Sequence, residues 1–216
     1  MRTEIFFPYL ASILFSAITA FVYRKHLGSR NLSIMLPYLI LVFIQESILG
    51  IASLLEYYTS NAIVYNIYRP VTVMIFAFIY YHIPIMKPLR KVILWITAFY
   101  FVVIVVNYLF VESIFTTSSY LVLARGFVIT MYGILFLMRY FHLDNREEEK
   151  YWHPLIWITT GIVIFYPVIS ISTSFQKYMT SESLYGFKLY QVIPQVMSIF
   201  MYSCFSYAFY LCRRKS

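Results

Sequence analysis

The sequence predicts an all-α integral membrane protein built as a bundle of seven transmembrane helices. Hydrophobic residues make up 61% of the 216 residues, charged residues only 12%, and the mean hydropathy is +0.73. A transmembrane helix needs about 20 mostly apolar residues, and segments of that kind recur along nearly the whole chain. The aromatic content of 21% is also high for a soluble domain. We therefore expect residues 1–216 to form a single membrane domain.

Seven apolar segments have the length of a membrane span. In chain order they are 5–23, 33–56, 62–82, 92–110, 118–140, 154–175 and 187–211. Basic residues follow the first segment instead of preceding it, so we expect a retained anchor there and not a cleaved signal peptide. The connections are short, which favours antiparallel neighbours that pack in chain order.

Polar residues at helical spacing give the segments inward faces. The first segment carries Tyr9, Ser12, Ser16 and Thr19, and the second carries Glu46, Gly50 and Ser53. Asn66 and Arg69 share a face of the third, Asn107 lies near the end of the fourth, and Arg125 lies in the fifth. The sixth carries Tyr166, Ser170 and Thr173, and the seventh Lys188, Gln191, Gln195, Ser198 and Tyr202. Because polar groups are costly against lipid, these faces should point into the bundle.

Basic residues gather in alternate loops. They are Arg24, Lys25, Arg30, Lys87, Arg90, Lys91, Arg139, Arg146, Lys150, Arg213, Arg214 and Lys215. The positive-inside rule then predicts an N-terminus outside and a C-terminus in the cytoplasm. The formal net charge of +8 reflects this topology and contact with lipid headgroups, so we expect no nucleic-acid partner.

Ionisable groups inside apolar segments are the best candidates for a functional site. Each costs roughly 2.5–3.5 kcal/mol on insertion scales, so it marks a partner or a function. The strongest polar groups fall in the predicted outer half: Glu46, Glu56, Asn66, Arg69, Asn107, Arg125, Lys188, Gln191 and Gln195. We expect a polar, net-positive pocket there that binds a small polar ligand with a carboxylate, phosphate or other anionic group. The alternative is a structural network in which the charges neutralise one another.

Motifs for catalysis or metal binding are missing from the sequence. His26, His82, His142 and His153 all map to the cytoplasmic side and lack paired metal-ligand spacing. The sequence has no phosphate-binding glycine loop and no nucleophile elbow. Cys204 and Cys212 lie at the end of the chain's last span, so we expect no disulfide framework. The prediction is therefore no catalytic residue, no metal, no cofactor and no enzymatic activity.

Two short motifs resemble those of a broad group of uncharacterised bacterial seven-helix proteins found mainly in Bacteroidota. The motifs are Tyr65-Asn66-Ile67-Tyr68, and Trp157-Ile158-Thr159-Thr160-Gly161 continuing to Phe165-Tyr166. Members often carry an acidic residue after the Tyr-Asn motif, where this chain has Arg69-Pro70. Genes of this group often neighbour histidine kinases or response regulators, so the resemblance implies signalling in a bacterial inner membrane.

A non-enzymatic membrane receptor, sensor or signalling accessory is the function that the sequence favours. The mixed charge run in 141–153 is the best cytoplasmic surface for a signalling partner, and a homo-oligomer is left open. The main alternative is a small transporter or channel. A membrane enzyme acting on lipid through the histidines and a membrane effector in phage defence are lesser alternatives.

Overall fold

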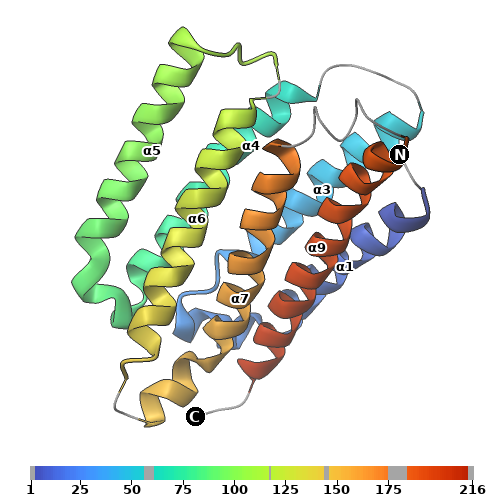
Figure 1. Ribbon diagram of the computed structural model, residues 1–216. Helices are drawn as coiled ribbons and strands as arrows, with labels where there is room; N and C mark the ends of the chain where they lie inside the picture. The colour runs from blue at the N-terminus through green and yellow to red at the C-terminus, as the bar shows by residue number, and fades with distance from the viewer. Residues whose placement is uncertain (1–2, 56–60, 117, 144–145, 175–183, 214–216) are drawn as a thin grey trace.

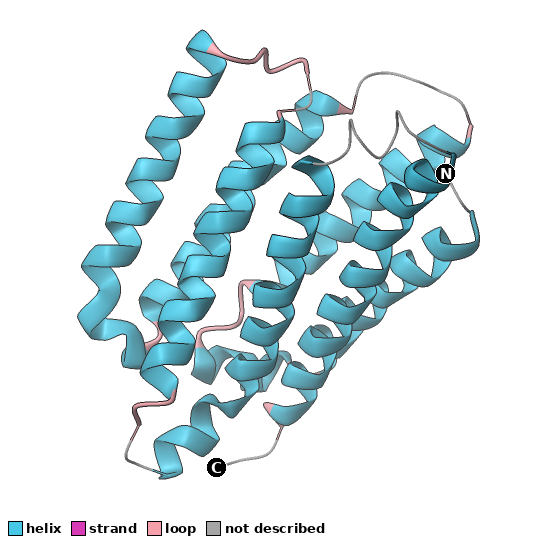
Figure 2. Cartoon of the chain, in the orientation of Figure 1, coloured by secondary structure: helices cyan, strands magenta, loops and turns pink. Residues whose placement is uncertain are grey.

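The computed structural model is a bundle of α-helices and describes residues 3–55, 61–116, 118–143, 146–174 and 184–213 (Figures 1 and 2). Its long helices are α1 (Thr3–Val22), α3 (Met35–Leu54), α4 (Ala62–His82), α5 (Arg90–Phe110), α6 (Ser119–Tyr140), α7 (Arg146–Ser174) and α9 (Leu184–Leu211). Within the described residues, seven helices are long and apolar enough to cross a membrane. The predicted all-α seven-helix bundle is therefore confirmed.

Short helices occupy the loops at the lower end of the bundle in Figure 1. They are α2 (Arg24–Leu27), η1 (Gly28–Arg30) and η2 (Pro84–Leu89). The two ends of the chain lie at opposite ends of the bundle (Figure 1). An odd number of spans requires this arrangement. Which end faces the cytoplasm stays a prediction from the loop charges.

The main boundary difference concerns α7, which begins at Arg146 and not at the predicted residue 154. Hydropathy finds only the apolar part of a helix, whereas backbone hydrogen bonding continues into polar sequence. The residues before the span include Glu and Lys, which have high helix propensity. The predicted loop 141–153 is therefore largely the first turns of a helix. Residues 144 and 145 of that loop lie outside the described residues.

Most consecutive helices pack against each other as predicted, and the packing departs from chain order at α3 and α4 and where α1 meets α9. α1 packs against α3 and α9, α9 packs against α7, and α7 packs against α6. α4 and α5 pack against each other and against α6, with α5 at the edge of the bundle (Figure 1). Consecutive helices α3 and α4 are not among the closely packed pairs. Their tyrosines Tyr38 and Tyr68 stack between them with ring centroids 6.5 Å apart, and such large side chains hold the two backbones apart.

Glycines allow the closest helix contacts, as is common in membrane bundles. A Cβ atom at Gly126 would overlap Ser170 of α7, and one at Gly133 would press on Val163 and Thr159 of the same helix. These two positions bring α6 against α7. Gly161 does the same for α7 and α9, where a Cβ atom would lie 3.1 Å from that of Cys204.

The lower half of the bundle is filled with aromatic side chains. Tyr80, Phe76, Tyr132 and Phe136 are essentially inaccessible to solvent. The Tyr80 hydroxyl lies 3.0 Å from the Thr159 hydroxyl, and the Tyr132 hydroxyl lies 2.7 Å from the Thr97 hydroxyl. Each buried hydroxyl thus has a partner, which removes most of the penalty for burying it. Outward-facing side chains such as Trp95, which is 76% exposed, are also apolar, as a lipid-facing surface requires.

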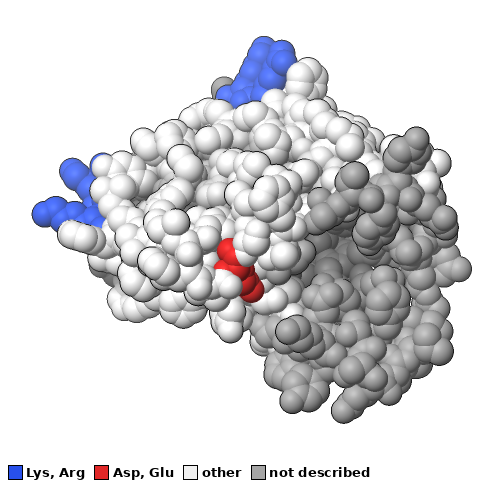
Figure 3. Space-filling model, turned by 90° about the horizontal axis from the view of Figure 1, so that it is seen from above, with Lys and Arg blue, Asp and Glu red and all other residues white. Residues whose placement is uncertain are grey.

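Two of the basic residues at the lower end form hydrogen bonds that hold the fold together. Arg30 is buried and donates hydrogen bonds of 3.0 Å to the Tyr151 and Cys212 carbonyls, which ties its loop to α7 and to the end of α9. Arg90 donates a 2.8 Å hydrogen bond to the Tyr81 carbonyl. Seen from above, the described part of the opposite end shows Lys and Arg only at its margins (Figure 3). As far as the described residues go, the two ends therefore differ in charge, which is the asymmetry that the topology prediction uses.

Candidate functional site

Two arginines lie in the upper half of the bundle, and they differ in their hydrogen bonding. Arg69 of α4 is only 5% exposed and donates hydrogen bonds to Asn66 Oδ1 at 2.5 Å and to the Ser118 carbonyl at 3.1 Å. Asn66 in turn donates to the Ile114 and Thr116 carbonyls at 2.7 and 2.9 Å. Together they fasten α4 to the loop between α5 and α6.

A second set of bonds extends this fastening to α5. Asn107 is buried and donates to Glu112 Oε2 at 3.3 Å and to Ser118 Oγ at 3.2 Å. Ser118 also hydrogen-bonds Glu112 through its hydroxyl, which in addition caps α6 by accepting from the Leu121 amide at 3.2 Å. Glu112 attracts Arg69 electrostatically.

Arg69, Asn66 and Asn107 therefore belong to a structural network with Glu112 and Ser118. In the alternative of charges that neutralise one another, Arg69 would pair with Glu46, Glu56 or the glutamines of the last span. Within the described residues, its hydrogen bonds go to its own helix and to a loop carbonyl and not to Glu46, while the side chains of Glu56 and Gln191 are not described. The sequence interpretation missed Glu112 because it follows a span instead of lying within one. Its signal was an acidic residue close behind Asn107 in a chain with few acids.

Glu46 of α3 lies next to the tyrosines Tyr9 and Tyr65. Its carboxylate accepts a hydrogen bond from the Tyr65 hydroxyl at 3.2 Å, and the Tyr9 hydroxyl interacts with the same carboxylate. Arg125 attracts Glu46 electrostatically, but the hydrogen bonds to Glu46 come from tyrosines. These hydroxyls from α1 and α4 satisfy part of the carboxylate, so Glu46 does not depend on a guanidinium partner.

Arg125 of α6 is the exception among these charges. Its guanidinium lies over the Tyr166 ring, 5.5 Å from the centroid, and its Nε atom is buried without a hydrogen-bond partner among the described residues. It is also close enough to Arg69 for the two charges to repel each other. Buried polar atoms in native structures nearly always have partners, so a bare guanidinium atom calls for an explanation. An anion would supply one, because it would accept from Arg125 and relieve the repulsion.

Tyrosines from three helices lie near Arg125; Tyr166 and Tyr202 are buried and Tyr68 is half-buried. Tyr68, Tyr166 and Tyr202, from α4, α7 and α9, all interact electrostatically with it. The Tyr68 hydroxyl lies 3.0 Å from the Tyr38 hydroxyl of α3. We predicted inward faces containing Tyr166 and Tyr202 but did not single out Tyr38 or Tyr68. With 22 tyrosines in the chain, composition alone could not indicate which ones meet.

Three further predicted site residues fall where the structure says little. Glu56 lies outside the described residues, and Lys188 and Gln191 lie on α9 with side chains that are not described. Gln195 is half-buried on the same helix. Whether these residues join Arg125 stays a prediction.

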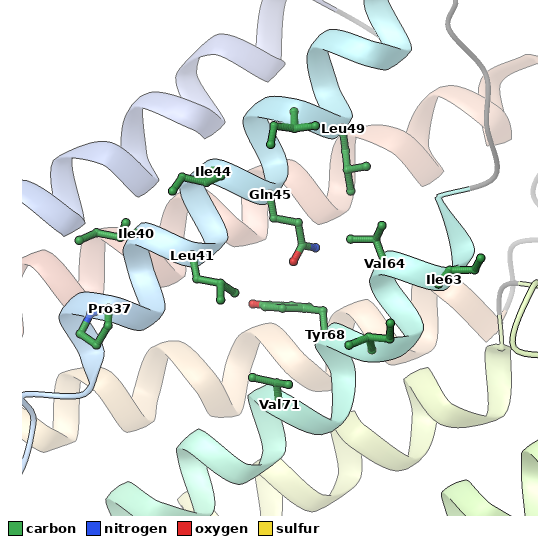
Figure 4. Close-up of a pocket in the computed structure, with 12 residues that line it drawn as sticks. Pro37, Ile40, Leu41, Ile44, Gln45, Leu49, Ile63, Val64, Tyr68 and Val71 are labelled. Atoms are coloured by element: carbon green, nitrogen blue, oxygen red, sulfur yellow. The ribbon is translucent and has the colours of Figure 1, made fainter.

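A large groove lies between α3 and α4 (Figure 4), and most of its apolar lining side chains are exposed, so it opens on the outer surface of the bundle where lipid would lie. Its volume is about 730 Å³, and its walls are almost wholly apolar, with Ile44 and Leu41 on one helix and Val64 and Ile67 on the other. Gln45 and Tyr68 point into it from the two sides (Figure 4). The expected pocket was polar and open to the outside, so this lateral groove is a different kind of site.

Groups that could hold a metal ion, meaning three or more His, Cys, Asp or Glu side chains, are absent from the residues that the structure describes. His82 and His142 donate through Nδ1 to carbonyls of their own helices, those of Phe78 at 2.8 Å and Met138 at 2.6 Å. Each ring thus satisfies a backbone carbonyl near the C-terminal end of its helix, at the basic end of the bundle.

Comparison with known proteins adds no further assignment. No protein-family model, curated protein or solved structure matches this chain. The resemblance to bacterial seven-helix proteins therefore stays a prediction, and function has to be argued from the site itself.

Proposed function

We propose that this protein is a non-enzymatic membrane receptor or sensor that binds a ligand with an anionic group at Arg125. The observation that carries the proposal is the contrast between the two arginines. Arg69 has hydrogen-bond partners on its own helix and in a loop, whereas the buried Nε atom of Arg125 has none in the described part of the chain. A structural network would be expected to satisfy both.

Arginine suits this role because its planar guanidinium presents parallel N–H donors to a carboxylate or phosphate. The positive charge of Arg69 adds to the potential at the site, and the carboxylate of Glu46 offsets part of it. Tyr68 and Tyr202 add hydroxyl groups from two other helices. An anionic ligand would therefore contact several helices at once, which is what a receptor needs if binding is to change the bundle.

The packing of the lower half favours a receptor over a transporter or channel. A transport path would have to pass the layer of Phe76, Tyr80, Tyr132 and Phe136, whose side chains are fully buried. Opening it would disrupt the Tyr80–Thr159 and Tyr132–Thr97 contacts together. A ligand at Arg125 would occupy only the upper half of the bundle and would not have to cross this layer.

A receptor of this kind passes its signal to a partner. We propose that this partner docks at the basic lower end, through the segment 141–153 that leads into α7. The bacterial inner membrane, with the C-terminus in the cytoplasm, is the proposed location because the basic residues gather at that end.

The proposal can be tested with ligands that have the same eight-carbon alkyl chain and differ only in their headgroup. The purified full-length protein in a neutral detergent would be heated with octanoate, octyl phosphate, octylamine or octanol. Octanoate or octyl phosphate should raise the melting temperature of the wild-type protein, and octylamine and octanol should not. Arg125→Leu should abolish the increase, while Arg125→Lys should retain part of it because the charge remains.

Arg69→Lys is the matched control, since it keeps the charge of an arginine that we assign to structure. It should lower the starting melting temperature and still respond to octanoate. Equal stabilisation by all four compounds, or a response that survives in Arg125→Leu, would contradict the proposed function.

A further inference from the structure

The groove between α3 and α4 shares one side chain, Tyr68, with the surroundings of Arg125. It runs along α3 from Pro37 to Leu49, a distance of about 18 Å at 1.5 Å per residue. The hydrocarbon core of a bilayer is about 30 Å thick, so the chains of one leaflet fill roughly 15 Å. A volume near 730 Å³ also lies within the usual range for small-molecule sites, roughly 300–1,000 Å³. The groove therefore has the dimensions of a site for one extended alkyl chain.

Two polar groups distinguish this groove from an ordinary lipid-facing crevice. Gln45 points into it (Figure 4), and its buried Nε2 atom has no hydrogen-bond partner among the residues that the structure describes. Tyr68 forms the opposite wall (Figure 4). Plain hydrocarbon would leave the Gln45 amide unsatisfied, at a cost of about 1–3 kcal/mol. A polar acceptor carried by the occupant would remove that cost.

Tyr68 also separates the groove from the charged interior. Its ring lines the groove, while its hydroxyl contacts Tyr38 and interacts with Arg125 and Glu46. An anionic headgroup in the groove would thus be attracted inward by Arg125. The apolar walls, the orphan amide and the cation behind Tyr68 all fit one kind of molecule.

We infer that the ligand is a single-chain amphiphile with an anionic headgroup, which enters sideways from the bilayer between α3 and α4. Its chain lies along the groove, and its carboxylate or phosphate is directed past Gln45 and Tyr68 toward Arg125. This inference rests on the proposed function, because it names the class of ligand for the same arginine.

Photo-crosslinking tests the route. The probe is a palmitate analogue with a diazirine in mid-chain and a terminal alkyne, added to the full-length protein in phosphatidylcholine nanodiscs. Adducts mapped by mass spectrometry should concentrate on the groove-lining stretches of α3 and α4. Val64→Trp fills the groove and should reduce these adducts about tenfold, equivalent to about 1.4 kcal/mol.

The matched control is Val102→Trp on α5. Val102 is 58% exposed and Val64 is 41% exposed, but only Val64 lines the groove. Leu41→Trp blocks the same groove from α3 and should reproduce the loss if Val64→Trp folds poorly. Excess palmitate or lysophosphatidic acid should suppress the adducts, and the stronger competitor identifies the headgroup, whereas methyl palmitate should not compete.

The outcomes separate the two proposals. Adducts spread over all lipid-facing helices, or unchanged by Val64→Trp and Leu41→Trp, would overturn the lateral route while the response of Arg125 to octanoate could still stand. Adducts that respond to groove filling but not to Arg125→Leu, with methyl palmitate competing as well as palmitate, would overturn the anionic headgroup and the proposed function with it.

Discussion

Replacing Arg69 with leucine should destabilise the bundle far more than the same replacement at Arg125. Arg69→Leu removes both hydrogen bonds from the guanidinium: Asn66 Oδ1 loses its donor, and the Ser118 carbonyl keeps only the Val122 amide at 3.4 Å. The loss of each of these buried bonds costs about 1–3 kcal/mol, so we expect a total loss of roughly 2–6 kcal/mol. Arg125→Leu loses a cation–π contact worth about 0.5–2 kcal/mol and also removes a poorly solvated charge, so its net effect should be under about 1 kcal/mol.

Equilibrium unfolding by steric trapping in neutral bicelles would measure both variants. A double-mutant cycle with Asn66→Leu isolates the pair, and its coupling energy should lie in the range of about 0.5–3 kcal/mol seen for residues in contact. Equal losses for the two leucine variants, or a larger loss for Arg125→Leu, would refute the claim that Arg69 stabilises the bundle and that Arg125 is available to a ligand.

Three further outcomes follow from the structure. Gly126→Val should destabilise the protein by about 1–3 kcal/mol, because the new side chain overlaps Ser170 of α7; Ala124→Val, on the same helix at a half-buried position, is the control for the same unfolding measurement. Burial raises the pKa of the Cys212 thiol to about 11, so less thiolate forms below that pH; in a Cys204→Ser background, maleimide labelling should be slow at pH 8 and should quicken toward pH 11, and a rate that levels off near pH 9 would contradict this. Reporter fusions at Ser60, Thr117 and Ser181 should read as extracytoplasmic, and fusions at Gly28, Pro88 and Asn145 as cytoplasmic; the reverse pattern would contradict the topology.

The architecture could be predicted from sequence because membrane spans leave a strong one-dimensional signal. The predicted span 62–82 coincides with α4, and the other spans match their helices apart from their ends. The pairing of helices carries no comparable signal. α1 packs against α9 from the far end of the chain, and α3 stands apart from α4 although the two are consecutive.

For the candidate site too, the sequence could identify single residues but not the contacts between them. Arg69 and Arg125 could both be identified as costly residues, since depth and charge are read from the sequence. Their partners could not, because Arg69 pairs with the carbonyl of Ser118, a group that every residue possesses. The groove was also beyond prediction, since it arises from where Tyr68 and Gln45 meet across two helices.

Contact between a ligand carboxylate and the guanidinium of Arg125 is the central claim, and solid-state NMR can measure it directly. Octanoate labelled with ¹³C at the carboxylate would be added to protein with ¹⁵N-labelled arginine, and rotational-echo dephasing would report contact between the two. We predict dephasing in the wild-type protein and in Arg69→Lys, and its loss in Arg125→Lys. Dephasing that persists in Arg125→Lys, or no dephasing in the wild-type protein at saturating octanoate, would contradict the account.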